Sequence, residues 1–331
     1  MHMMDIGQGV NIMSAKIGLR FSESSYYGYI IKGDLHGALH YIEQFPEQTE
    51  LLEKYRLVFE NKQYVVYPVD DELNSILQIY QQYYVDVFYN NIKSEEAEDK
   101  LRERLADFFG IKDRKELSEI EHNQVAELFR SKGFYFMGGK TSGYYGPYIW
   151  KSAEVKTYKV ELPKGTREYK IALLDEFITK SWIDYLSFGK ISPGGWTDGD
   201  GIINCIKSSY DFNSENFIVS LLKHEAQHAM DLSNYKNISS EDLEYRAKLV
   251  ELIYSKERNL LEWFVLEADN SNNGNGHSLA AGRIVEGFNR KLNLSDVALT
   301  GLSITQIQSI ARELLEESEM LLNSKCRDSY D

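Results

Sequence analysis

The segment HEAQH at residues 224–228 constrains the fold more than any other part of the sequence, because its two histidines are four residues apart. Four residues make slightly more than one α-helical turn, so both imidazoles lie on one face of a helix. Phe217 and Leu221 extend the same stripe toward the N-terminus, at steps of four and three that lead to His224. The sequence thus predicts one amphipathic helix that carries both histidines. Its N-cap is offered by Asp211, Asn213 and Ser214.

Two imidazoles one helical turn apart, with a glutamate beside them, have the spacing of a zinc site. We expect His224 and His228 to bind one Zn²⁺ ion at about 2.0–2.1 Å. Zinc lowers the pKa of water toward about 7, and Glu225 is placed to accept the proton as general base. The alternative is a helix that carries two surface histidines and an acid by coincidence. With 7 histidines in the whole chain, that coincidence is the weaker explanation.

A catalytic zinc ion needs a third protein ligand and one open position. Glu244 is the favoured candidate, because it lies near the start of the next predicted helix and Ala247 follows one turn later, which lets two helices approach closely. Glu241 and Glu251 are on the same side at helical spacing, so either could replace it. Solvated surface charge is the ordinary explanation for glutamates in such a run.

The motif together with the later segment Glu244-Tyr245-Arg246-Ala247 resembles the gluzincin branch of the zincin metallopeptidases. The resemblance implies that His224, His228 and Glu244 are the metal ligands and that Glu225 is the catalytic base. It also implies a strand-rich part before the active-site helix, helices after it, and an edge strand that pairs with extended substrate. Residues 201–210 occupy the position of that edge strand.

Two further side chains are candidates for roles around the metal. His277 follows an Asn/Gly-rich stretch that could bend back to the cleft, and we expect it to stabilise the developing oxyanion. The alternative is a histidine that hydrogen-bonds the backbone at a helix start. Asp231, three residues after His228, is a candidate to accept the second N–H of a ligating histidine. It could equally be an exposed aspartate near a helix end.

The pattern of apolar residues predicts an α+β protein in two parts. Residues 1–130 are expected to be mainly helical, with the clearest helical spacing between Asp71 and Asn91. Residues 131–331 are expected to form a zincin-like domain, with a mixed or antiparallel sheet before the active-site helix and helices after it. Alternation on both sides of the turn at 163–166 predicts a β-hairpin. The segment Ser303-Ile304-Thr305-Gln306 is a capping box that opens a last helix.

Other motifs favour structural explanations. His36 and His40 also have metal spacing, but glycine stands at position 37 and no third ligand follows, so we interpret them as structural. Aromatic residues near the expected start of the sheet could form a substrate wall, although core packing is the commoner role of aromatics in strands. They are Tyr144, Tyr145, Tyr148 and Trp150.

Charge and composition narrow the class of partner. The net charge of −14 would repel a phosphate backbone, so nucleic acid is not expected as a partner. No apolar run has the length of a membrane span, and the first residues lack the features of an export signal. The 2 cysteines are too few for a disulfide framework. We therefore expect a cytoplasmic protein that does not bind membranes, with unconventional secretion and the oligomeric state left open.

These features predict a zinc-dependent peptidase that hydrolyses peptide bonds in a peptide or protein substrate. Two alternatives keep the metal site but change the function. One is a catalytically inactive zinc-binding interaction module, against which the intact Glu225 argues. The other is a metal-dependent hydrolase of small amides.

Overall fold

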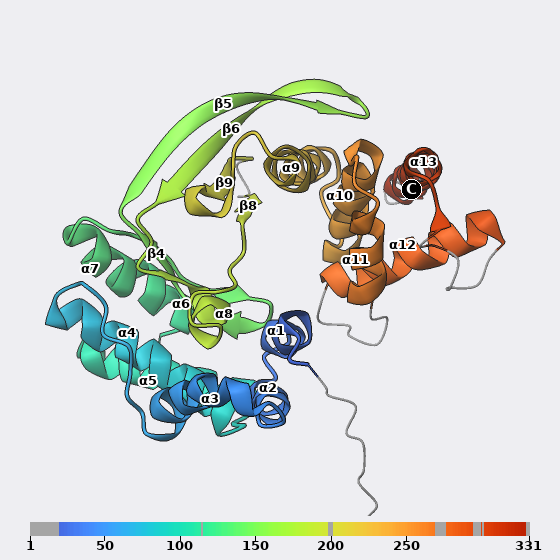
Figure 1. Ribbon diagram of the computed structural model, residues 1–331. Helices are drawn as coiled ribbons and strands as arrows, with labels where there is room; N and C mark the ends of the chain where they lie inside the picture. Colours follow the sequence, from blue (N-terminus) through green and yellow to red (C-terminus); the bar gives the residue numbers. More distant parts are fainter. Residues whose placement is uncertain are drawn as a thin grey trace, which may run out of the picture.

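The computed structural model describes residues 20–113, 115–197, 201–268, 276–293, 299 and 301–328, with side chains up to residue 324. It shows a mixed α+β fold, in agreement with the expected class. Figure 1 shows the helices of the first part on one side of the molecule and the last helices on the other, with a long β-hairpin arching over the middle. None of the helices in the described ranges combines the length and apolar character that crossing a bilayer requires.

The first part of the chain is helical, as predicted. Asp70 caps the strongest predicted helix by accepting a hydrogen bond from the backbone N–H of Leu73. The helices of this region, some of which continue into tighter or wider turns marked η, are α1 (Glu23–Ile31), α2 (Leu35–Ile42), η1 (Pro46–Gln48), α3 (Thr49–Tyr55), η2 (Arg56–Glu60), α4 (Asp71–Tyr84), η3 (Val85–Tyr89), α5 (Ser94–Phe108), α6 (Leu117–Ile120), η4 (Glu121–Val125) and α7 (Ala126–Ser131).

The strands that follow form three sheets in the described part of the chain. Two are small: β1 (Tyr135–Met137), β4 (Tyr148–Trp150) and β7 (Thr179–Lys180) form one, and β2 (Lys140–Thr141) and β3 (Tyr144–Tyr145) form the other. The main sheet has the strand order β5-β6-β9-β8. It consists of β5 (Ser152–Leu162), β6 (Gly165–Asp175), β9 (Ile203–Ile206) and β8 (Gly195–Thr197). Helix α8 (Ser181–Leu186) lies between β7 and β8 in sequence.

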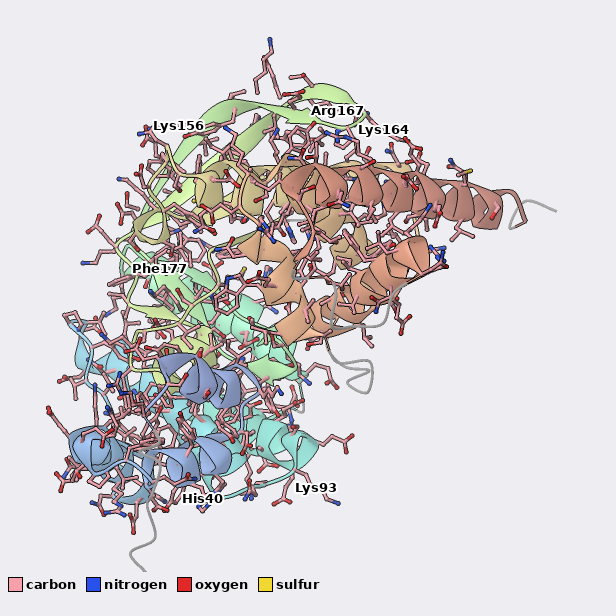
Figure 2. All side chains as sticks on the ribbon, turned by 45° about the vertical axis from the view of Figure 1, so that its right-hand side comes forward. His40, Lys93, Lys156, Lys164, Arg167 and Phe177 are labelled. Atoms are coloured by element: carbon pink, nitrogen blue, oxygen red, sulfur yellow. The ribbon has the colours of Figure 1, made fainter. Side chains whose placement is uncertain are left out.

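The main sheet is mixed, as the sequence allowed. Strands β5 and β6 form the predicted antiparallel hairpin, in which Tyr158 faces Tyr169. Gly165 closes its turn with a φ of +118°, a conformation that L side chains rarely adopt. Strand β6 then pairs in parallel with β9, and β9 pairs antiparallel with β8. In Figure 2 the hairpin tip, marked by Lys164 and Arg167, is at the opposite end of the molecule from the N-terminal helices.

The prediction that residues 201–210 form the edge strand is wrong. Only Ile203–Ile206 are extended there, and this strand β9 lies inside the sheet, between β6 and β8. All four of its residues are buried, which is typical of a strand covered on both faces. The edge strand beside β9 is β8. Position 195 in this strand requires glycine, because an added Cβ would lie 2.3 Å from the backbone oxygen of Asn204.

The last part of the chain is helical and encloses the second half of the sheet. Ser239 caps α10, and Ser303 with Gln306 forms the predicted capping box before α13, with hydrogen bonds of 3.0 and 3.3 Å. The helices are η6 (Asn216–Lys223), α9 (His224–Asn234), α10 (Ser240–Tyr254), α11 (Asn259–Glu267), α12 (Gly276–Leu292) and α13 (Ile304–Asp328).

Two large hydrophobic cores divide the molecule. One joins the main sheet to α9, α10, α12 and α13. The other is built from α1–α7 and also takes in Ile149, Trp182, Tyr185 and Leu186 from beyond them. A folding boundary at residue 130 therefore stays a prediction, and residues 134–191 supply side chains to both cores.

A buried carboxyl group in the helical core predicts a pH dependence of stability. The Tyr80 hydroxyl donates to Glu121 Oε1 at 2.6 Å, and the Gly139 N–H donates to Oε2 at 2.9 Å. Burial nevertheless raises the pKa of Glu121 from 4.5 to about 7. Because the folded chain then binds a proton that the unfolded chain releases, this stabilisation is complete below pH 4.5 and is lost as the pH rises to about 7.

Glu121→Gln, which resembles the protonated acid, should remove this dependence. We expect the variant and the wild type to unfold at similar urea concentrations at pH 5. At pH 8 the variant should be more stable by about 3 kcal/mol. Glu127→Gln, on the exposed face of α7, is the control and should leave the difference between the two pH values unchanged. If the free energy of unfolding changed equally between pH 5 and pH 8 in the wild type and in Glu121→Gln, Glu121 would be ionised at both pH values.

Candidate metal centre

The two motif histidines lie where α9 begins, between the main sheet and α10. Phe217 and Leu221, on the stripe that leads to them, are buried in the core beside the sheet. Ser214 caps the turn before them, its hydroxyl accepting from the N–H of Phe217 at 3.2 Å. His224 and His228 are themselves buried, at 7% and 8% exposure. The predicted helix and its shared face are confirmed.

The structure brings Glu244 of α10 to these histidines, and the three side chains form the one group of possible metal ligands found among the described residues. Glu244 Oε2 lies 3.4 Å from His224 Nε2, and Oε1 lies 3.5 Å from His228 Nε2. Tetrahedral ligands at zinc distances are separated by roughly 3.3–3.5 Å, so both separations fit. The two Nε2 atoms are 2.9 Å apart, the length of a hydrogen bond, so a metal ion would take the place of the shared proton.

The polar atoms of this group are incompletely satisfied by the surrounding protein. Glu244 Oε2 is buried and makes no directed hydrogen bond within the described part of the chain, although two histidines lie within ion-pair distance of it. Buried polar atoms are nearly always hydrogen-bonded, and an exception calls for an explanation such as an ion. The donor set, two imidazoles and one carboxylate, is the kind that zinc prefers. The residues therefore fit a zinc ion.

Charges around the centre also favour a cation. Burial by itself lowers the pKa of His224, but the Glu251 and Glu244 carboxylates outweigh it and hold that pKa well above its usual value. Burial by itself raises the pKa of Glu244, but the close contacts with His224, His228 and His277 outweigh it and lower that pKa. The group thus holds an ionised carboxylate against positive charge.

Glu251 has a role that the sequence did not indicate. Its Oε1 lies 2.7 Å from His224 Nδ1, one heptad along α10 from Glu244. A carboxylate at this nitrogen accepts a hydrogen bond from Nδ1–H, which keeps the proton on Nδ1 and leaves the lone pair of Nε2 for a metal ion. Glu251 is therefore placed as the partner of His224 Nδ1, whereas Glu244 belongs to the possible ligand group. Glu241, the other alternative, instead lies 3.4 Å from Arg283.

Removing this partner should weaken metal binding. We expect Glu251→Ala to lower the affinity for zinc about 10–100-fold, because the imidazole of His224 loses its fixed orientation and some of its basicity. Competition with a zinc chelator of known affinity measures the change. Glu241→Ala, on the same helix, is the matched control and should stay within about twofold. Equal affinities of Glu251→Ala and wild type would contradict the orienting role.

Asp231 pairs with an arginine and not with one of the two histidines, so the role expected for it is not observed. Its two carboxylate oxygens accept from Arg246 at 2.7 and 3.0 Å, and Oδ2 also accepts from Gln227 at 2.8 Å. It is fully buried, at 0% exposure, and is not an exposed helix-end aspartate either. Asp231 thus pairs with Arg246 of α10, which in turn contacts Glu319 of α13.

Glu225 points into the same cleft and is held by the edge strand. The Thr197 hydroxyl lies 2.6 Å from Glu225 Oε2 and 3.2 Å from the Glu225 carbonyl oxygen. Among the residues that the structure describes, Oε1 accepts no hydrogen bond and so stays available for a proton. No pattern in the sequence indicated Thr197, because its contact with Glu225 depends on how β8 packs beside α9.

His277 is at the start of α12, where its Nδ1 lies 3.0 Å from Glu244 Oε2. The side chain is 53% exposed. The structure therefore brings His277 to the third ligand, at the mouth of the site. Its role as an oxyanion donor stays a prediction.

A cleft of about 760 Å³ opens over these residues. Besides the three candidate ligands and Glu225, it is lined by β8, by α8, by α11 and by Ile31 of the N-terminal helical region. The aromatic residues near the start of the sheet do not line it, in agreement with their structural interpretation: Tyr148 and Trp150 are buried, and Tyr144 packs on Phe88. His36 donates to the Tyr89 carbonyl oxygen at 2.7 Å, in agreement with its structural interpretation.

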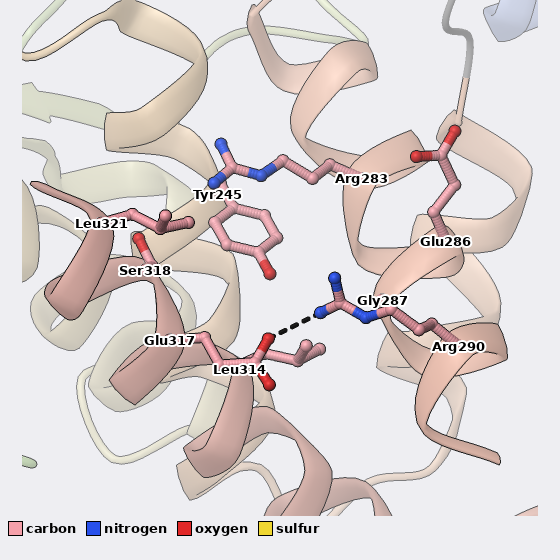
Figure 3. A pocket seen from close by; sticks show the side chains of 9 residues that line it. All are labelled: Tyr245, Arg283, Glu286, Gly287, Arg290, Leu314, Glu317, Ser318 and Leu321. Carbon is pink, nitrogen blue, oxygen red and sulfur yellow. Dashed lines mark hydrogen bonds and ion pairs between the residues drawn. The ribbon is translucent and has the colours of Figure 1, made fainter.

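A second cavity, of about 400 Å³, lies behind α10 and contains paired charges (Figure 3). Arg283 lies 4.0 Å above the ring of Tyr245 and 2.6 Å from Asp242. Arg290 lies 2.6 Å from Glu317. Because these acids already neutralise both guanidinium groups, the cavity is best explained as a junction that joins α12 to α10 and α13.

Comparison of the chain with known protein families, with curated proteins and with solved structures found no match. The interpretation of the site therefore depends on its own geometry and chemistry.

Proposed function

We propose that the protein is a zinc-dependent peptidase of the gluzincin type, with His224, His228 and Glu244 as ligands. The observation that carries the proposal is the spacing of the three ligand groups, 3.4 and 3.5 Å between Glu244 and the two histidines. The same cleft contains a glutamate that takes no part in ligation. A binding module without catalysis has no need of that carboxylate.

A bound zinc ion supplies Lewis-acid chemistry, polarising a carbonyl group and lowering the pKa of water. Glu225 accepts the proton of the attacking water at Oε1 and passes it to the departing amine. Thr197 holds the other carboxylate oxygen, so the base keeps one orientation during both transfers. His277, beside Glu244, is the candidate to donate a hydrogen bond to the developing oxyanion.

The edge strand supports a peptide as the substrate. Strand β8 ends the described main sheet, and residues 193–197 line the cleft. An extended peptide can pair with such an edge through main-chain hydrogen bonds, which places its carbonyl groups beside the metal ligands. Small amides have no main chain to pair in this way.

Incubation of zinc-replete protein with a diverse peptide mixture, followed by mass spectrometry, tests the proposal. We expect cleavage that stops on chelation and returns when zinc is added. A parallel incubation with low-molecular-weight amides separates a small-amide hydrolase from a peptidase. Protein that holds one zinc ion yet cleaves neither class would instead be an inactive binding module, and the proposal would be wrong.

A further inference from the structure

The cleft over the metal centre has an apolar wall beside the helical core. Ile31 at the end of α1, Ile183 in α8 and Ile191 line the cleft together with the metal ligands, although Ile31 is 193 positions before His224 in the sequence. Helices α1 and α8 pack against each other, which brings these residues to the same side of the molecule. The metal centre is thus enclosed by both parts of the chain.

This wall is apolar and firmly supported. Ile183 and Ile191 pack against the helical core from its border, and Ile31 keeps 50% of its surface exposed. Trp182, which also lines the cleft, is almost fully buried, and its indole N–H donates to the Thr141 carbonyl oxygen at 2.7 Å. Exposed isoleucine on a rigid support has hydrophobic surface to bury when a ligand binds.

The charged side chains that line the cleft are not part of this apolar wall. Three of its acids belong to the metal centre, namely Glu225, Glu244 and Glu251. Among the described lining residues the one lysine or arginine is Lys248, and its ammonium group lies 2.7 Å from Glu267. It also lies 4.3 Å above the ring of Phe264. The isoleucine wall therefore presents no charged partner for a charged substrate side chain.

We infer that the isoleucine wall, formed by Ile31, Ile183 and Ile191, binds an apolar side chain of the peptide substrate. Through Ile31 the N-terminal helical region is then part of the substrate-binding site and contributes to its specificity, together with Ile183 and Ile191. This inference rests on the proposed function for the nature of the ligand. Placing a charged or small polar side chain against the wall buries isoleucine surface without a matching apolar partner.

Ile31→Ser tests the inference, because Ile31 is exposed and its replacement leaves the helical core intact. The substrates are peptides found to be cleaved, together with copies in which single leucine or phenylalanine residues are replaced by serine. For the peptide with the apolar residue at the recognised position, we expect Ile31→Ser to lower kcat/KM about 10-fold. For the matching serine peptide the change should stay below about twofold.

Leu57→Ser is the matched control, since Leu57 is exposed to a similar degree, 43%, and lies outside the cleft lining. Its kinetics should equal those of the wild type. A second variant, Ile191→Ser, should shift selectivity in the same direction as Ile31→Ser. Thermal unfolding and zinc content of each variant show that fold and metal centre are intact.

Peptide binding to zinc-loaded protein in the Glu225→Gln background supplies a readout that does not depend on turnover. Ile31→Ser should raise Kd for the apolar peptide about 10-fold in this background. Unchanged selectivity and unchanged Kd in both isoleucine variants would overturn the inference while the proposed function stands. Binding that depends on Ile31 without cleavage by the wild type would support the wall and refute the peptidase.

Discussion

Glu225→Gln is expected to abolish peptide cleavage while the protein keeps its zinc ion. The substitution preserves the size of the side chain and one oxygen for the Thr197 hydroxyl, but an amide cannot accept the proton of the attacking water. General-base catalysis contributes about 10²–10⁴-fold to rate, so we expect kcat to fall by at least 10²-fold. The test measures kcat for a cleaved peptide, together with the zinc content of the same sample.

Glu262→Gln, an exposed residue of α11, is the control for loss of a negative charge near the cleft and should keep wild-type kcat. Zinc content near one ion per chain in Glu225→Gln separates loss of the base from loss of the metal. Full activity in that variant would show that another group accepts the proton. The assignment of Glu225 would then fail even though zinc ligation stands.

Local spacing explains which parts of the metal centre were predictable. The distance between His224 and His228 is set by one turn of one helix, so sequence spacing alone places both imidazoles. Glu244 is on another helix, and its approach to the histidines depends on how α10 packs against α9. The sequence indicated three glutamates on one face of that helix, and only packing distinguishes the ligand from the partner of His224 Nδ1.

Long-range pairing of strands explains which parts of the fold could not be predicted from the sequence. Strand β9 was predicted as a strand, but its position inside the sheet depends on the parallel pairing with β6, which no local pattern encodes. Strand β8 has three residues, too few for alternation to be recognised. Thr197 therefore had no signal, although it holds the proposed base. The contribution of Ile31 to the cleft depends in the same way on packing between distant helices.

Asp231 has an important contact in the structure, but it is not the contact that the spacing in the sequence suggested. Residues three apart on a helix are neighbours, so its position after His228 indicated a contact with a ligand. The same side chain is also within reach of a neighbouring helix. The structure directs it to Arg246, which is 1% exposed. Burial of both partners makes this ion pair a strong constraint on how α9 and α10 pack.

Arg246→Met is therefore expected to destabilise the fold by about 3–5 kcal/mol, because it leaves the Asp231 carboxylate buried with only the Gln227 amide as a partner. Urea unfolding at pH 7 measures the free energy of unfolding. Arg290→Met removes an exposed pair with Glu317 and should cost about 1 kcal/mol or less. A loss below about 1 kcal/mol in Arg246→Met would show that the charge of Asp231 is compensated elsewhere.

The double variant Arg246→Met, Asp231→Leu separates the cost of an unpaired charge from the value of the pair itself. Replacing both partners by apolar groups should recover most of the lost stability, since a buried ion pair contributes little net free energy. Zinc affinity should not recover to the same extent. Asp231 is on the helix of the two histidines and Arg246 is two residues after Glu244, so the bidentate pair fixes the relative position of the helices that carry the three proposed ligands.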